Sequence, residues 1–104
     1  MAQFKGVSIA KAANILYGGN ITSRSITFED GSKKTLGIML PGEYALNTVN
    51  KEIIDIQMGS LEVLLPAQEW KKYDAPASFE VPANSKFKLR VHNLTDYCCS
   101  FIKN

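Results

Sequence analysis

The sequence predicts a single small all-β barrel, and three observations lead to this expectation. Short segments rich in β-branched and aromatic residues recur along the 104-residue chain, and turns containing Pro or Gly separate them. No linker, repeat or low-complexity tract divides the chain. A barrel suits many short strands because closure leaves no unpaired edge. We therefore expect one domain over residues 1–104, with residues 1–13 as an N-terminal arm or first strand.

The first half of the chain contains three clear strand candidates. Ile21 to Phe28 is rich in Thr, Ser and Ile, and Glu29 to Ser32 is a polar turn. Leu36 to Leu40 is a second candidate, and Pro41-Gly42 predicts a type II turn after it. Glu43 to Thr48 then returns as a third strand.

The second half alternates between apolar and polar residues. Ile53 to Met58 and Leu61 to Leu65 flank Gly59-Ser60, which predicts a tight hairpin. Further strands are expected at Phe79–Val81, Phe87–His92 and Tyr97–Ile102. A period of two places one face of each strand inside. The predicted core includes Ile54, Ile56, Leu61, Val63, Leu65, Phe87, Leu89 and Val91.

Residues 8 to 16 are ambiguous. Ala10, Lys11, Ala12 and Ala13 favour a short helix by propensity. The following Tyr17 to Asn20 segment, with two glycines, suits either a helix stop or a hairpin turn.

Composition excludes several classes of function. A net charge of +2 is too small to indicate nucleic acid or an anionic membrane as a partner. No apolar run approaches the roughly 20 residues of a membrane helix, and Met1 to Gly6 lacks a signal-peptide core. The two cysteines, Cys98 and Cys99, are adjacent, unlike a disulfide framework. We expect a cytoplasmic protein with free thiols.

Several segments, in their order and spacing, resemble the metal-free cupins that act as pyrimidine/purine nucleoside phosphorylases. The resemblance covers about Asn14 to Phe101. It is carried by Ser23-Arg24, Gly37–Tyr44, Glu52–Gly59, Leu61–Pro66, Glu69-Trp70, Phe79–Ser85 and Phe87–Leu89. It implies a cupin-type jelly-roll barrel with extended structure, not helix, at Asn14 to Tyr17.

The cupin metal ligands are largely missing. Glu52 and Gly59 keep the spacing of the first cupin motif, but Leu46 and Thr48, or Ala45 and Asn47, stand where its two histidines belong. Phe87 replaces the histidine of the second motif. A first-row metal normally needs three or more N, O or S ligands. We expect no metal and no cofactor, with inorganic phosphate as a co-substrate.

The implied reaction assigns roles to six residues. Phosphate would displace the base from ribose C1′ through an oxocarbenium-like transition state. Arg24, with Ser23, is the predicted phosphate ligand, since guanidinium matches phosphate oxygens; the alternative is a solvated strand arginine. Glu52 would bind the ribose hydroxyls or protonate the leaving base, and the alternative is a rim glutamate. Tyr44 is a second catalytic candidate, and the alternative is a core aromatic with one hydroxyl partner. Thr48 is predicted to bind substrate, and Tyr97 either lines the cavity or packs in the core.

Three functions remain open from the sequence. The first is nucleoside phosphorolysis, with nucleosides and phosphate as partners. The second is a metal-free cupin that binds a sugar or nucleotide without catalysis, and the third is an assembly module. We also expect a homodimer.

Overall fold

The computed structural model describes residues 2–103, and within them every regular element but one is a strand. The large sheet contains β1 (Ser8–Ile9), β2 (Asn14–Leu16), β3 (Ile21–Thr27), β4 (Lys33–Met39), β11 (Thr95–Ile102), β6 (Lys51–Met58) and β9 (Ala77–Val81). The small sheet contains β5 (Gly42–Asn47), β10 (Lys86–Val91), β7 (Ser60–Leu64) and β8 (Lys71–Asp74). The exception is η1 (Tyr17–Gly19), a single 3-10 turn.

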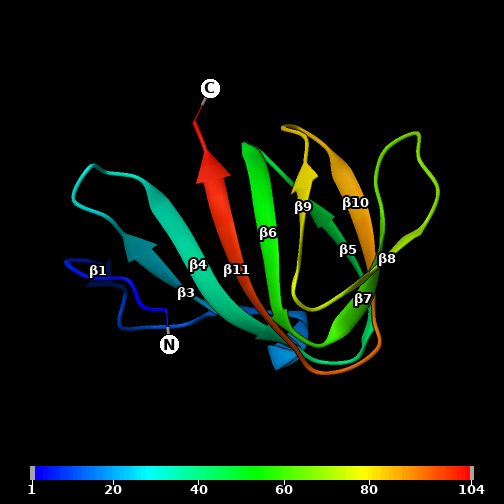
Figure 1. Cartoon of the computed structure of the whole chain (residues 1–104), viewed down its shortest axis with the longest axis horizontal. Coiled ribbons are helices and arrows are strands. Elements are labelled where there is room, and N and C mark those ends of the chain that lie inside the picture. Colours follow the sequence, from blue (N-terminus) through cyan, green and yellow to red (C-terminus); the bar gives the residue numbers. More distant parts are fainter. Residues whose placement is uncertain (1, 104) are drawn as a thin grey trace.

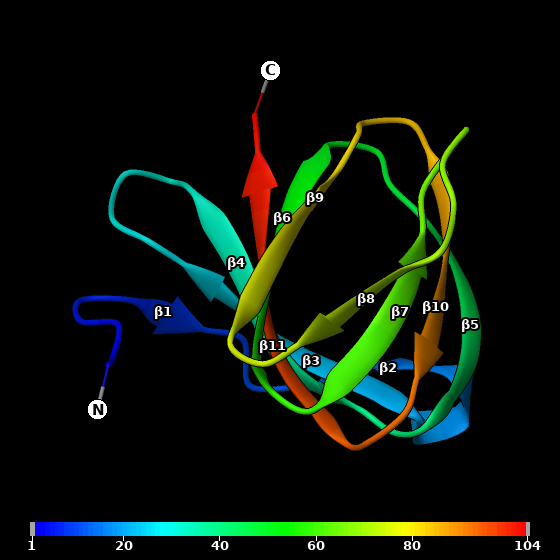
Figure 2. The same cartoon turned by 45° about the vertical axis from the view of Figure 1, so that its right-hand side comes forward.

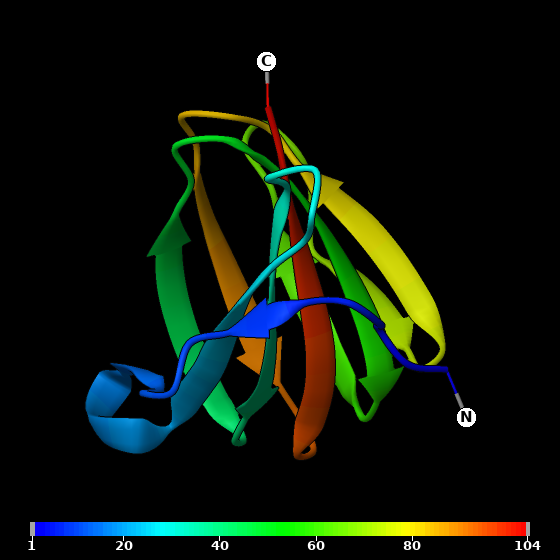
Figure 3. The ribbon, with the colours of Figure 1, turned by 90° about the vertical axis from the view of Figure 1, so that its left-hand side faces the viewer.

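The two sheets face one another as an open jelly-roll barrel (Figures 1 and 2). Strands β4, β11 and β6 form the middle of the large sheet, with β3 beside β4 and β9 beside β6. Figure 3 shows the N-terminal segment and β1, in dark blue, at the free edge of the large sheet. All strand pairs are antiparallel.

The alternating strands place their apolar residues between the sheets, as predicted. Leu89, Val63 and Leu61 are almost fully buried, and Phe87, Val91, Ile54 and Ile56 join them in one core cluster. Leu65 is partly buried and packs against this cluster. The predicted buried face of β10 is therefore confirmed, because a shift of one residue would expose all of the apolar side chains of this strand.

Two predicted turns connect the sheets instead of pairing neighbouring strands. The strands on either side of Gly59 are not paired: β6 belongs to the large sheet and β7 to the small one. The predicted Gly59-Ser60 hairpin is therefore wrong. A Cβ on Gly59 would lie 2.5 Å from the Leu94 carbonyl oxygen, so the crossing needs glycine. Likewise, Pro41-Gly42 takes the chain from β4 to β5 in the other sheet.

The ambiguous N-terminal segment is extended. Asn14 to Leu16 pairs with β3, as the family resemblance implies, and Tyr17 begins the 3-10 turn. The Tyr17 hydroxyl donates to the Ala45 carbonyl oxygen of β5, and its ring lies 5.0 Å from that of Tyr44. The turn thereby links the large sheet to the edge of the small one. Within residues 2–103, no helix has the length and apolar character needed to cross a membrane.

Candidate active site

A cavity of about 880 Å³ lies between the sheets. The large sheet contributes most of its polar groups: Asn14, Ser23, Ser25, Lys33, Thr35, Glu52, Tyr97 and Cys99. Apolar side chains from both sheets complete the wall: Leu16, Ile21, Met39, Leu46, Ile54, Phe87 and Leu89. A concave, mostly apolar space with a few converging polar groups is the usual form of a small-molecule site.

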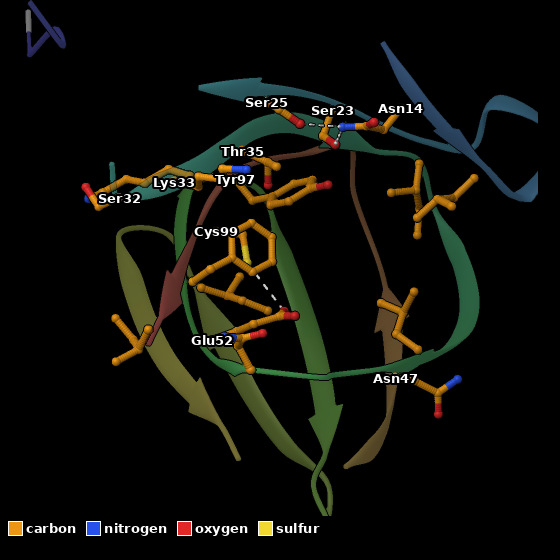
Figure 4. Close-up of a pocket in the computed structure, with 18 of the residues that line it drawn as sticks. Asn14, Ser23, Ser25, Ser32, Lys33, Thr35, Asn47, Glu52, Tyr97 and Cys99 are labelled. Atoms are coloured by element: carbon orange, nitrogen blue, oxygen red, sulfur yellow. Dashed lines mark hydrogen bonds between the residues drawn. The ribbon is translucent and has the colours of Figure 1, made fainter. Parts of the chain in front are cut away.

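Strand alternation brings the polar side chains into rows. Ser25 on β3 is in register with Thr35 on β4, and Thr35 is in register with Cys99 on β11. Since directly opposed residues share a face, their side chains form a polar row across three strands. Tyr97 lies two residues before Cys99 on the same face (Figure 4).

Glu52 is bound by Cys99 inside the cavity. The Cys99 thiol donates a hydrogen bond to the carboxylate, with 3.3 Å between Sγ and Oε1 (Figure 4). Burial raises the pKa of Glu52, and the bond from Cys99 opposes that rise. Burial, then the neighbouring Glu52 carboxylate, raises the pKa of the Cys99 thiol. The pair therefore favours a neutral thiol beside a carboxyl that retains its proton more readily than usual.

Tyr97 extends across β4 through the space that Gly37 leaves. A Cβ on Gly37 would lie 2.9 Å from the Tyr97 hydroxyl oxygen and 2.0 Å from the Thr22 carbonyl oxygen. The bare glycine thus lets the phenol extend toward Ser23. Burial raises the pKa of Tyr97 to about 12, so its hydroxyl is a hydrogen-bond donor at neutral pH.

Asn14 positions the two serines of β3. Its side-chain amide donates to the Ser23 hydroxyl at 3.2 Å and to the Ser25 hydroxyl at 3.1 Å (Figure 4). The three side chains come from β2 and β3, which pair through Asn14 and Ser23 themselves. This edge of the cavity consequently offers fixed hydroxyls to a polar ligand.

The structure brings together three of the six predicted site residues. Ser23, Glu52 and Tyr97 all line the cavity. Arg24 is exposed on the opposite face of β3, because it alternates with Ser23 and Ser25. Its role with phosphate stays a prediction, and Arg24 does not line the cavity of its own chain.

Tyr44 and Thr48 point inward, as expected, but neither lines the cavity. The Tyr44 hydroxyl donates to the Leu40 carbonyl oxygen at 2.7 Å. The Thr48 hydroxyl donates to the Pro82 carbonyl oxygen at 2.6 Å and accepts the Ser85 backbone N–H at 3.0 Å. These contacts support local structure, and the predicted roles of both residues in catalysis and binding stay predictions.

Sequence reasoning missed Cys99, Asn14 and Thr35 as cavity residues. The alternation that places Tyr97 inside also places Cys99 inside, so a signal for Cys99 was available. No sequence pattern around Cys99 predicts its contact with Glu52, because the two residues are 47 positions apart in the chain. Asn14 lay in the segment whose secondary structure was ambiguous.

The positions that carry metal ligands in the cupin motifs lie at the cavity or near it. Leu46 and Phe87 line the wall, where imidazoles would otherwise point. No three His, Cys, Asp or Glu side chains gather within residues 2–103 in a way that could hold a metal ion. The expectation of a metal-free site stays a prediction.

Comparison with known proteins gives one consistent family. A family model described as pyrimidine/purine nucleoside phosphorylase matches residues 11–101. A protein with that name from Chlorobium chlorochromatii is 59% identical over 102 residues, covering 98% of this chain and 99% of its own. Another from Sulfurimonas denitrificans is 52% identical, covering 99% of this chain and 100% of its own.

Solved structures agree on the fold. A protein of unknown function from Acinetobacter has a TM-score of 0.91 at 36% identity, covering 96% of this chain and 98% of its own. A cupin-2 domain protein from Shewanella frigidimarina has a TM-score of 0.64 at 14% identity, covering 78% and 79%. The second likeness concerns the fold alone, which is that of a cupin.

Proposed function

The chain belongs to the pyrimidine/purine nucleoside phosphorylase family, and we propose that it cleaves purine and pyrimidine nucleosides with inorganic phosphate, releasing free base and ribose 1-phosphate. One observation carries the proposal beyond family membership. A partly buried carboxyl, a phenol and fixed hydroxyls line one wall of a cavity whose other walls are largely apolar. Such a cavity suits a nucleoside, which has a polar sugar and a flat base.

The reaction needs little from the protein. Phosphate oxygen forms a bond to C1′ as the C1′–N bond breaks, and that bond's electron pair leaves with the base, which is then protonated. No covalent enzyme intermediate is required, because phosphate is the nucleophile. Holding the two reactants in line contributes on the order of 7–11 kcal/mol. A small cavity with few functional groups is therefore sufficient.

We assign Glu52 to the ribose hydroxyls or to protonation of the leaving base. Its raised pKa suits the acid role, whereas the ionised carboxylate would accept hydrogen bonds from the ribose hydroxyls. The neutral Tyr97 hydroxyl and the Ser23 hydroxyl would orient the sugar. Cys99 is a positioning residue, since it contacts Glu52 and holds the carboxylate.

Product analysis tests the proposal. The protein is incubated with inosine or uridine, with and without phosphate, and free base and ribose 1-phosphate are measured. We expect release of both products only with phosphate, and a strong loss in Glu52→Gln. Stabilisation by the nucleoside without product would favour the binding-only cupin instead. If the protein neither binds the nucleoside nor releases a product, the remaining function is that of an assembly module.

The assembly and location of the protein are also proposals. The outer face of the large sheet exposes Ile9, Ile15 and Leu36 around Arg24, which supports a homodimer formed through this face. Two buried free thiols support a reducing compartment such as the cytoplasm.

A further inference from the structure

We propose that Lys33, with the hydroxyls of Ser25 and Thr35, binds the phosphate co-substrate at the end of the cavity where β4 begins. The inference rests on the proposed phosphorolysis, because it states where that same site holds its anion. It differs from the sequence-based assignment of phosphate to Arg24.

Strand geometry places Lys33 on the correct face. It lies an even number of residues from Thr35 and Met39, so the three side chains share one face of β4, and all three residues line the cavity. Two residues along a strand span about 7 Å, and the lysine stem is long and flexible. Its ammonium can consequently reach the pair of hydroxyls formed by Ser25 and Thr35, which are in register. Figure 4 shows Lys33 and Thr35 on the same side of the cavity.

The other cations near this end are engaged or point elsewhere. Lys34 also contributes to the cavity lining, but its ammonium lies over two aromatic rings, 5.4 Å from the Phe4 centroid and 5.8 Å from that of Phe28. Lys103 also lines the cavity, as does Asp30, whose pKa is lowered first by its hydrogen bonds from Ser32 and last by the charge of Lys103. Arg24 is on the outer face of β3. Among residues 2–103, Lys33 takes part in none of the ion pairs.

The position also suits the reaction. Thr35 is opposite Cys99, and the Cys99 thiol binds Glu52. A phosphate at Thr35 and a carboxyl at Glu52 would therefore lie on either side of Cys99 on the same wall of the cavity, facing the space that the ribose would enter. Phosphate carries about −1.5 to −2 charges at neutral pH, so an unpaired ammonium is its natural counter-ion.

Steady-state kinetics with varied phosphate tests the site. We compare Lys33→Met with Lys33→Arg, which keeps the charge, and with Lys34→Met and Arg24→Met, which remove neighbouring charges from the outer face. Lys33→Met should raise the KM for phosphate about tenfold or more, with little change in the KM for uridine. Lys33→Arg should retain most of the affinity, and Lys34→Met should behave as wild type. Arg24→Met separates the two assignments, and it should leave the KM for phosphate unchanged if Lys33 holds the anion. Thermal melts check that each variant folds.

A wild-type KM for phosphate in folded Lys33→Met, or an equal rise in Arg24→Met, would overturn the assignment. Titration of inorganic phosphate by calorimetry, without nucleoside, separates this site from the proposed function. If phosphate binding depends on Lys33 but the protein releases no base, the phosphate site is supported and phosphorolysis is rejected. If Lys33→Met releases base as fast as the wild type at every phosphate concentration, phosphorolysis is supported and the phosphate site at Lys33 is rejected. No phosphate binding by the wild type would also reject it.

Discussion

The Cys99 thiol donates to the Glu52 carboxylate between neighbouring strands β11 and β6, at 3.3 Å from Sγ to Oε1. Both side chains line the cavity, although Glu52 is only partly buried while Cys99 is almost fully buried. The thiol is neutral at ordinary pH because its pKa is raised. It consequently acts as a donor that orients a carboxylate, not as a nucleophile.

Replacing this thiol should shift the pH dependence of the reaction. The bond from Cys99 lowers the pKa of Glu52, so its removal in Cys99→Val should raise that pKa further. If activity requires ionised Glu52, the acid limb of the kcat profile should move to higher pH. We also expect kcat to fall about 2- to 13-fold, since a net hydrogen bond is worth about 0.5–1.5 kcal/mol. Cys99→Ser retains a donor and should lie nearer wild type. Identical acid limbs in all three proteins would contradict a positioning role.

Glu52→Gln should stabilise the fold at neutral pH. The Glu52 pKa is raised by burial, so the folded chain binds more protons than the unfolded chain as the pH rises above about 4.5. Stability is therefore lost as pH increases through this window, and the loss persists at neutral pH. A glutamine does not ionise and avoids that loss. Thermal melts should show a higher Tm for Glu52→Gln at pH 7 and a shrinking difference below pH 4.5. Glu69→Gln, at an exposed position, is the control, and a Tm gain of equal size there would refute the argument.

Tyr97→Phe should lower activity without changing the basic limb of the pH profile. The Tyr97 pKa of about 12 keeps its hydroxyl protonated up to about pH 10, so it donates and does not titrate in that range. Loss of one such bond should reduce kcat/KM about 2- to 13-fold. Tyr73→Phe removes a hydroxyl outside the cavity and serves as the control. A basic limb below pH 10 that disappears in Tyr97→Phe would show that the hydroxyl does ionise.

Leu89→Ala should destabilise the protein by about 2–5 kcal/mol, because it empties space at a side chain that is 1% exposed. Lys88→Ala changes the exposed neighbour on the same strand and should cost less than about 0.5 kcal/mol. Urea unfolding measures both. Equal losses in the two variants would mean that β10 has the opposite register.

Period-two alternation predicted the core and the interior faces because it depends only on the strand itself. The alternation around Leu89 was sufficient to identify its buried face without knowledge of any partner strand. The sheet to which each strand belongs depends on distant pairing. For that reason Gly59 was misread as a hairpin residue: its local sequence does not show that β6 pairs with β11 and β9. Strand β8 (Lys71–Asp74) was missed because it is short and mostly charged.

In the candidate site, too, some residues could be predicted from the sequence and others depend on how distant strands pair. Glu52 could be nominated from its position in the family pattern and Tyr97 from its place on the last strand, and both line the cavity. Arg24 and Ser23 are adjacent in sequence, yet they point to opposite faces of β3, so a motif that names both cannot say which one faces the ligand. The contact between Cys99 and Glu52 depends on pairing across 47 residues and needed the structure.

The outer face of the large sheet should mediate self-association. Leu36 lies near its centre on β4, and Ile15, which is 65% exposed, lies on β2, with β3 between these two strands. Apolar side chains of this kind gain by removal from water. Sedimentation velocity of the wild type should give a species of twice 11.5 kDa. Leu36→Asp should shift the protein toward monomers, because a carboxylate in the interface loses its hydration even where it pairs with the opposed Arg24. Val49→Asp changes a residue that is 79% exposed in a loop and should remain dimeric. Circular dichroism establishes that both variants are folded. A monomeric wild type, or a Leu36→Asp dimer as tight as wild type, would remove this face from the interface.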